Sequence, residues 1–122
     1  MKKLLIIEDD LDLRELIASS LEEDGYSVKG CSDGSAGLEV AADWPPDIII
    51  LDLIMPTMNG FEFLRKMLNR DPNAAVIVLS GYLEKETEEI IVEMGVKDFL
   101  RKPLNYESLL GKISDVGRAP LA

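Results

Sequence analysis

The chain has 122 residues, a length typical of one domain with a single hydrophobic core. Its composition, 47% hydrophobic and 30% charged, excludes disordered and fibrous classes. The formal net charge of −10 repels phosphate backbones and anionic lipids, so we expect no direct binding to nucleic acid or to a membrane.

The cysteine content and the N-terminus favour the cytoplasm. Cys31 is the single cysteine, so no disulfide can form within the chain. The opening segment MKKLLII is followed at once by acidic residues and not by the small-residue cleavage site of a signal peptide. No apolar run is long enough to cross a bilayer. We therefore expect a cytoplasmic protein.

Short apolar runs recur along the chain and predict the strands of a parallel sheet. A continuous run at 4–7 predicts a strand buried on both faces, and a segment of mixed polarity at 26–31 predicts an edge strand. Runs rich in β-branched residues at 48–51 and 76–79 predict two more buried strands. The segment at 96–100 is again of mixed polarity and predicts the second edge strand.

Between the predicted strands, apolar residues recur at helical spacing. In three of these segments the residues concerned are Leu13, Leu16, Ile17 and Leu21, then Phe61, Leu64 and Leu68, then Ile90, Ile91 and Met94. A last helix is expected over 106–115. Regular alternation of strand and helix predicts an α/β fold with helices on both faces of the sheet. We expect one domain over 1–115 and a flexible tail over 116–122, where the pattern ends.

Polar residues stand where the predicted strands end. In open α/β sheets, ligands bind beyond the carboxyl ends of the strands, so these residues are expected to converge at one edge. They are Glu8, Asp9 and Asp10 after the first strand, Asp52 after the third, Ser80 and Gly81 after the fourth, and Arg101, Lys102 and Pro103 after the fifth. The edge would therefore combine several carboxylates with a hydroxyl and an ammonium.

This combination suits a divalent cation and a phosphoryl group. Carboxylates gathered at one edge repel one another unless a cation neutralises them. The sequence has no histidine and a single cysteine, so an all-oxygen Mg²⁺ site is favoured over a zinc site. Lys102 can then serve as a counter-charge for a phosphoryl oxygen, and Ser80 as a hydrogen-bond donor. Asp52 becomes the candidate nucleophile, because a carboxylate can take a phosphoryl group as an acyl phosphate.

Each of these residues also has a structural alternative. Asp10 is expected to cap the first helix, where a carboxylate accepts backbone N–H groups. A serine before glycine is common in turns, and most lysines lie on solvated surfaces. Asp52 is harder to explain in this way, because a carboxylate directly after four buried aliphatic residues is costly without a partner. The joint placement of the residues at matching strand ends carries the functional hypothesis.

Four segments, IIEDD, DIIILDLIMPTMNG, VIVLSGY and GVKDFLRKP, resemble the receiver domain of two-component response regulators, and the resemblance extends to about Asp115. It implies a flavodoxin-like, doubly wound sheet of five parallel strands in the order 2-1-3-4-5 with five helices. By the same resemblance, Asp52 is the phospho-acceptor, and Glu8 and Asp9 are the acidic pair that binds Mg²⁺. Asp52 itself and the backbone carbonyl of Ile54 would complete the metal site.

The resemblance also implies the parts of a switch. Ser80 stands at the position of the family's switching hydroxyl, and Phe99 at the position of its switching aromatic residue. Lys102 stands at the position of the family's characteristic lysine. A cis peptide bond is implied between Lys102 and Pro103, and the output surface would be the face of the fourth helix, fifth strand and fifth helix. Gly37 departs from the alanine that is usual in the family, and it predicts a locally soft second helix.

The implied function is a phosphorylation-dependent switch in two-component signalling or a phosphorelay. A histidine kinase or a phosphotransfer protein would supply the phosphoryl group, and the domain would catalyse only its own phosphorylation and dephosphorylation. One alternative is a Mg²⁺-dependent aspartyl-phosphate phosphatase, but enzymes resembling haloacid dehalogenases have an acid where this chain has Ile54. A receiver-like interaction module that is not phosphorylated would lack Asp52, Asp9 or Lys102, and all three are present.

Overall fold

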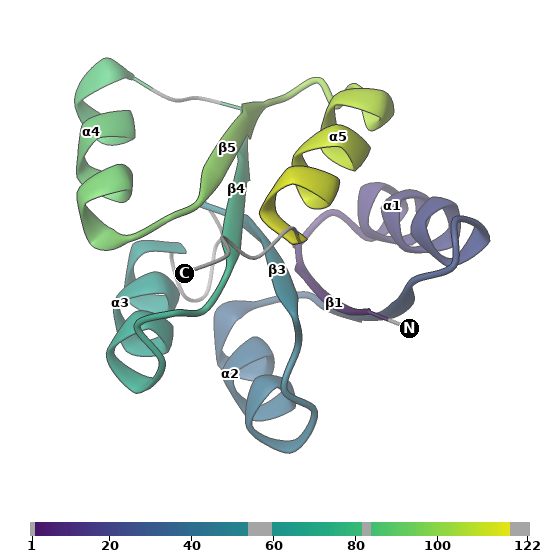
Figure 1. The fold of residues 1–122 in the computed structure, drawn as a ribbon, viewed down its shortest axis with the longest axis horizontal. Coiled ribbons are helices and arrows are strands. Elements are labelled where there is room, and N and C mark those ends of the chain that lie inside the picture. Colours follow the sequence, from purple (N-terminus) through teal and green to yellow (C-terminus); the bar gives the residue numbers. More distant parts are fainter. Residues whose placement is uncertain (1, 54–59, 82–83, 118–122) are drawn as a thin grey trace.

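The computed structural model describes residues 2–53, 60–81 and 84–117, and within them it forms one parallel sheet of five strands with five helices (Figure 1). The strands are β1 (Lys3–Ile7), β2 (Ser27–Cys31), β3 (Ile48–Asp52), β4 (Val76–Ser80) and β5 (Asp98–Arg101). The helices are α1 (Leu11–Glu23), α2 (Gly34–Asp43), α3 (Gly60–Arg70), α4 (Lys85–Met94) and α5 (Tyr106–Gly117). The sheet order is β2-β1-β3-β4-β5, which confirms the predicted fold class.

The three central strands are the three continuous apolar runs. Every residue of β3 and β4 is buried, because helices cover both faces of the sheet. The register places Ile50 between Ile6 of β1 and Ile77 of β4. The segments of mixed polarity form the edge strands β2 and β5, where one side of the strand has no partner strand.

Two hydrophobic cores lie on opposite faces of the sheet. On one face, α1 and α5 cover the sheet, and their buried residues are Ile17, Leu21, Leu109 and Ile113. On the other face, α2, α3 and α4 cover it, and their buried hydrophobic residues are Ala41, Phe63, Leu64, Met67, Leu68 and Ile91. Figure 1 shows these two groups of helices on either side of the strands.

Local side-chain interactions mark where helices begin. The Asp10 carboxylate accepts a hydrogen bond from the Leu13 amide at 3.1 Å, so the predicted cap of α1 is confirmed. Asp33 does the same for α2, accepting from the Ala36 amide at 2.8 Å. Within the described residues, no helix combines the length and the apolar character that a bilayer crossing requires.

Three expectations about helices differ from the structure. Leu16 is 62% exposed and Ile90 is 51% exposed, although both belong to predicted apolar patterns. The reason is that α1 and α4 each touch the protein along a narrow stripe, which contains Ile17 in α1 and Ile91 in α4. The last helix ends at Gly117, two residues later than predicted, so α5 takes the first part of the expected tail and residues 118–122 lie outside the described ranges.

Gly37 is buried in α2 at a point where the helix approaches β1 and α3 closely. A Cβ atom built on Gly37 would lie 2.5 Å from Cδ1 of Ile7 and 3.3 Å from Cε1 of Phe63. Such distances require a neighbour to move, so the glycine provides room for the Ile7 side chain. The departure from alanine therefore has a packing reason.

Candidate functional site

The carboxyl ends of the parallel strands bring the predicted site residues into one hollow. Its volume is about 390 Å³, and its lining consists of Glu8, Asp9, Asp10, Asp52, Ser80, Gly81 and Lys102. Glu8 and Asp9 directly follow β1, Asp52 and Ser80 are the last residues of β3 and β4, and Lys102 directly follows β5. Residues far apart in the sequence meet here because all strands run in the same direction.

Three of these polar residues are almost inaccessible to solvent. Glu8 is 1% exposed, Asp52 is 5% exposed and Ser80 is fully buried. Burying two carboxylates next to each other is unfavourable unless positive charge or hydrogen bonds compensate them. The ammonium of Lys102 supplies the positive charge, at 2.7 Å from Oε1 of Glu8 and 3.4 Å from Oδ2 of Asp52.

The carboxylates also affect one another's protonation. Burial, together with the neighbouring Asp52 and Asp9 carboxylates, raises the pKa of Glu8 to about 7, although the Lys102 ammonium opposes this. Burial also acts to raise the pKa of Asp9, but hydrogen bonds with the Glu8 and Asp52 carboxyls outweigh it and lower that pKa below its usual value. The pKa of Lys102 is raised, because its carboxylate partners outweigh the effect of burial. Of the acidic pair that follows β1, Glu8 therefore holds a proton more readily than Asp9.

The acidic cluster fits a hard divalent cation. Glu8, Asp9 and Asp52 each offer an oxygen atom, and these three atoms lie within 4.8 Å of one another. Two oxygens bound to one Mg²⁺ at about 2.1 Å lie roughly 3–4 Å apart, so small side-chain movements would bring the cluster to that geometry. A cation would also take over the charge compensation that a proton on Glu8 provides. The predicted fourth ligand, the carbonyl of Ile54, lies outside the described residues.

Ser80 and Phe99 share one face of the sheet. Val78 and Ser80 are two residues apart in β4, so their side chains point to the same face. Val78 pairs with Phe99 of β5, and both belong to the core under α2, α3 and α4. Phe99 is partly buried against this core and also lines a hollow of about 250 Å³ with α4. The hydroxyl at the site and the aromatic near α4 are therefore connected through adjacent strands.

Arg14 also reaches this edge, although no pattern in the sequence predicted it. Its Nη1 atom donates a hydrogen bond to the backbone carbonyl of Glu8 at 2.7 Å. Arg14 stands in the first turn of α1, where the positive end of the helix dipole disfavours a cation. That unfavourable position is the signal in the sequence that could have indicated a special role.

The doubly wound sheet with an acidic hollow at its carboxyl edge defines the CheY-like class of signalling domains. The sequence model described as the response regulator receiver domain matches residues 4–114. The chain therefore belongs to the response regulator receiver domain family.

Similar proteins agree with this assignment. The response regulator ArlR of Staphylococcus epidermidis is 33% identical over 118 residues, which cover 97% of this chain and 53% of ArlR. Protein CcdB of Bacillus subtilis is 32% identical over 117 residues, covering 95% of this chain and 98% of CcdB. The chain thus spans about half the length of regulators such as ArlR but nearly all of CcdB.

Solved structures show the same fold. The chemotaxis protein CheY4 of Vibrio cholerae is 30% identical with a TM-score of 0.88, and the similarity covers 95% of this chain and 98% of CheY4. The response regulator TrrA of Thermotoga maritima, solved in complex with Mg(2+)-BeF, is 25% identical with a TM-score of 0.85. That match covers 95% of this chain and 99% of TrrA.

Proposed function

We propose that this domain is a phosphorylation-dependent signalling switch that accepts a phosphoryl group on Asp52 in a Mg²⁺-dependent reaction. The observation that carries the proposal is the arrangement around Asp52. This carboxylate is 5% exposed, lies 3.4 Å from the Lys102 ammonium, and shares a cluster with Glu8 and Asp9. A buried nucleophile with an acidic cluster on one side and an ammonium on the other suits phosphoryl transfer better than a purely structural role.

The donor is a phosphohistidine on a histidine kinase or a phosphotransfer protein. A carboxylate oxygen of Asp52 attacks the phosphorus atom, the bond from phosphorus to the imidazole nitrogen breaks, and the imidazole leaves with the electron pair of that bond. The product is an acyl phosphate on Asp52, and hydrolysis by water later returns the carboxylate and inorganic phosphate. The domain would catalyse only these two reactions of its own side chain.

Glu8, Asp9 and Asp52 would hold the metal, with the carbonyl of Ile54 as a further proposed ligand. When bound, Mg²⁺ offsets the negative charge of the cluster and of the incoming phosphoryl group. The proposal is supported by the all-oxygen donor set and by the TrrA structure, which was solved with Mg(2+)-BeF.

Two further residues act on the phosphoryl group. Lys102 follows β5 and already reaches toward Asp52, so its ammonium is placed to contact a phosphoryl oxygen. The peptide bond between Lys102 and Pro103 is cis, as predicted from the family resemblance. Ser80 lines the same hollow, and its hydroxyl would donate a hydrogen bond to another phosphoryl oxygen.

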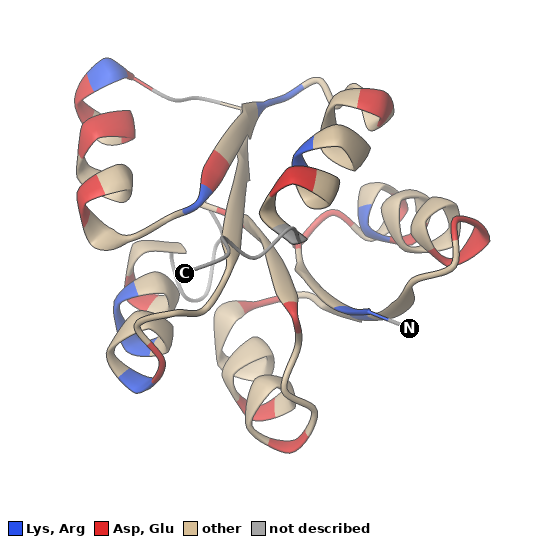
Figure 2. Cartoon of the chain, in the orientation of Figure 1, with Lys and Arg blue, Asp and Glu red and all other residues tan. Residues whose placement is uncertain are grey.

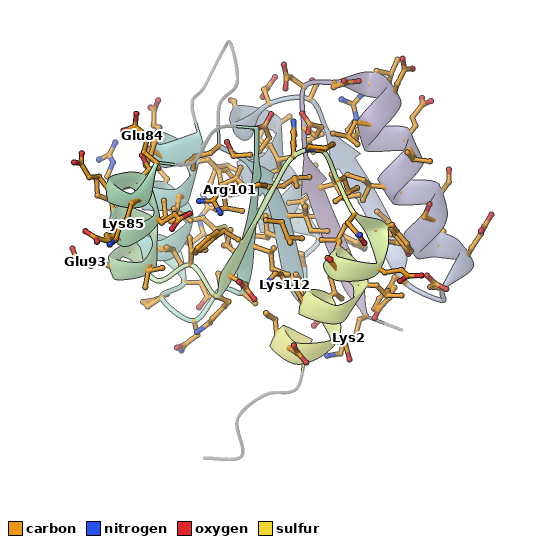
Figure 3. All side chains as sticks on the ribbon, turned by 90° about the horizontal axis from the view of Figure 1, so that it is seen from above. Lys2, Glu84, Lys85, Glu93, Arg101 and Lys112 are labelled. Atoms are coloured by element: carbon orange, nitrogen blue, oxygen red, sulfur yellow. The ribbon has the colours of Figure 1, made fainter. Side chains whose placement is uncertain are left out.

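The output surface would be the face of α4, β5 and α5. Movement of the Ser80 hydroxyl toward a phosphoryl group would free space on the face that it shares with Phe99, and the aromatic ring would then follow. Four glutamates make α4 strongly acidic, as Figure 2 shows. Arg101 of β5 forms an ion pair with Glu88 of α4, and Figure 3 shows its side chain on the side of β5 toward that helix. A partner with basic residues would match the acidic face.

The test is incubation with acetyl phosphate and Mg²⁺, followed by measurement of the intact mass. We expect the wild-type protein to gain one phosphoryl group, and to gain none when the metal is chelated. Asp52→Asn should gain none, whereas Asp47→Asn, just before the other end of β3, should react like the wild type. Failure of the wild type to gain mass would instead favour an interaction module that is not phosphorylated.

A further inference from the structure

Arg14 makes an interaction that the proposed chemistry does not require. Its guanidinium donates a hydrogen bond of 2.7 Å to the backbone carbonyl of Glu8, the first residue of the acidic pair. The side chain is partly buried, and no carboxylate within the described ranges forms an ion pair with it. A guanidinium with five donors is seldom left facing a carbonyl when the chain is rich in acids, so its position calls for an explanation.

The interaction holds the backbone just where β1 ends. The amide of Glu8 donates to the carbonyl of Cys31 at 3.0 Å, directly after Ile7 and Cys31, the last paired residues of β1 and β2. Its carbonyl accepts from Arg14, and the amide of Asp10 donates to Oε2 of Glu8 at 3.3 Å. The peptide group between Ile7 and Glu8 is therefore held by β2, and the next one, between Glu8 and Asp9, is held by Arg14 of α1. Rotation of this peptide group would redirect the Asp9 carboxylate.

Gly30 provides the space through which Arg14 reaches this carbonyl. In the register of the sheet, Gly30 of β2 lies beside Ile6 of β1, two residues before Glu8. A Cβ atom built on Gly30 would lie 3.1 Å from Cδ and 3.2 Å from Cγ of Arg14. These distances are shorter than ordinary van der Waals contact, so any larger residue would push against the aliphatic part of the arginine.

We infer that Arg14, passing over Gly30, is a positioning residue that fixes the Glu8–Asp9 peptide group so that both carboxylates face the Mg²⁺ site. This inference rests on the proposed function, because it concerns the metal that this function uses. Arg14 acts through the backbone and touches neither Asp52 nor a reacting atom. Outer residues that orient metal ligands commonly affect metal affinity by about tenfold or more when they are replaced.

The test compares Mg²⁺ affinity by isothermal titration calorimetry with thermal unfolding of the metal-free protein. Arg14→Met keeps the aliphatic stem over Gly30 and removes the donor, and we expect its Mg²⁺ affinity to fall about tenfold. Arg14→Lys keeps one charged donor and should recover part of the affinity. If Arg14 had only a structural role, the unfolding temperatures of these variants would change. Their Mg²⁺ affinities would then not rank with the wild type first, Arg14→Lys second and Arg14→Met last.

Gly30→Ala tests the same inference with the arginine intact. It should weaken Mg²⁺ binding by displacing Arg14, and in the Arg14→Met background it should have little further effect, because the donor that it displaces is already absent. The control is Gly111→Ala, since a Cβ atom on Gly111 of α5 would meet no atom within 4 Å. That variant should bind Mg²⁺ like the wild type.

Chemical shifts give a second measure that does not depend on activity. Arg14→Met should move the backbone amide signals of Asp9 and Asp10 in the metal-free protein, because the carbonyl next to them loses its donor. Wild-type Mg²⁺ affinity in both Arg14→Met and Gly30→Ala would overturn the inference and leave the proposed function standing. A wild-type protein that binds no Mg²⁺ would overturn both.

Discussion

The ammonium of Lys102 lies nearer to Glu8 than to Asp52, at 2.7 Å compared with 3.4 Å. The cation that would serve the phosphoryl group is thus paired mainly with Glu8, a proposed metal ligand. Glu8 is longer than an aspartate at the same place would be, which helps it to reach the ammonium. Charge compensation within the site therefore depends on whether Glu8 is bound to a proton, to Lys102 or to a metal.

The metal-free protein should lose stability as the pH rises from about 5 to about 8. The folded-state pKa of Glu8, about 7, lies above its usual value of 4.5, so the folded protein holds a proton there that the unfolded chain has released. Stability is then fully present below pH 4.5 and is lost as the pH rises through 7. This difference between the pKa values of the folded and unfolded states corresponds to roughly 3 kcal/mol of unfolding free energy. Asp9, with its lowered pKa, stays ionised throughout this range.

Urea denaturation at pH 5 and pH 8 in the presence of a chelator measures this effect, with Glu8→Gln as the comparison. The amide of the variant cannot ionise, so Glu8→Gln should have a higher unfolding free energy than the wild type at pH 8. This difference in unfolding free energy should be smaller at pH 5. Equal pH dependence in the two proteins would show that Glu8 does not titrate in this range.

Asp9 and Asp10 are neighbours with different tasks, and their alanine variants should show opposite patterns. Asp9→Ala removes a ligand of the cluster and should weaken Mg²⁺ binding by about tenfold or more while changing stability little. Asp10→Ala removes the cap of α1 and should cost about 1 kcal/mol of unfolding free energy, with a much smaller effect on Mg²⁺. Calorimetry and urea denaturation of both variants check this. The opposite pattern would mean that the two roles are exchanged.

Gly37→Ala should destabilise the protein even though alanine favours helices. Helix propensity favours alanine by up to about 1 kcal/mol, but the added Cβ would lie 2.5 Å from Cδ1 of Ile7, and overpacking of this kind costs about 1–3 kcal/mol. Ile7→Val removes the Cδ1 atom, so Gly37→Ala should be less harmful in that background. A double-mutant cycle by urea denaturation measures the coupling. Additive effects of the two substitutions would contradict the packing explanation.

Tyr106→Phe should weaken the connection between α5 and the end of α1. The Tyr106 hydroxyl donates a hydrogen bond of 2.6 Å to the Asp24 carboxylate, and burial together with this carboxylate raises the pKa of the phenol. Loss of one such bond at a partly exposed site should cost about 1 kcal/mol. Tyr26→Phe is the matched control, because within the described residues its hydroxyl has no hydrogen-bond partner. Equal stability of Tyr106→Phe and the wild type would show that the bond contributes nothing.

Several features of this protein follow from the sequence alone. The runs at 48–51 and 76–79 form buried strands because continuous β-branched and aliphatic residues suit a sheet that is covered on both faces. The acidic residues after 4–7 and the carboxylate at Asp52 lie at the carboxyl edge because parallel strands all end on the same side. The cap formed by Asp10 is also a local property, since donor and acceptor are three residues apart.

Only the tertiary structure decided the rest. The exposure of Leu16 depends on how narrowly α1 rests on the sheet, and helical spacing alone does not reveal the width of that contact. The packing reason for a glycine at Gly37 depends on the Ile7 side chain, which belongs to another element, β1. The bond from Arg14 to the Glu8 carbonyl depends on the space above Gly30, which exists only once α1 lies beside β2. Strand and helix patterns arise from neighbours along the chain, whereas these contacts arise from distances between elements, which the pattern of residue types does not specify.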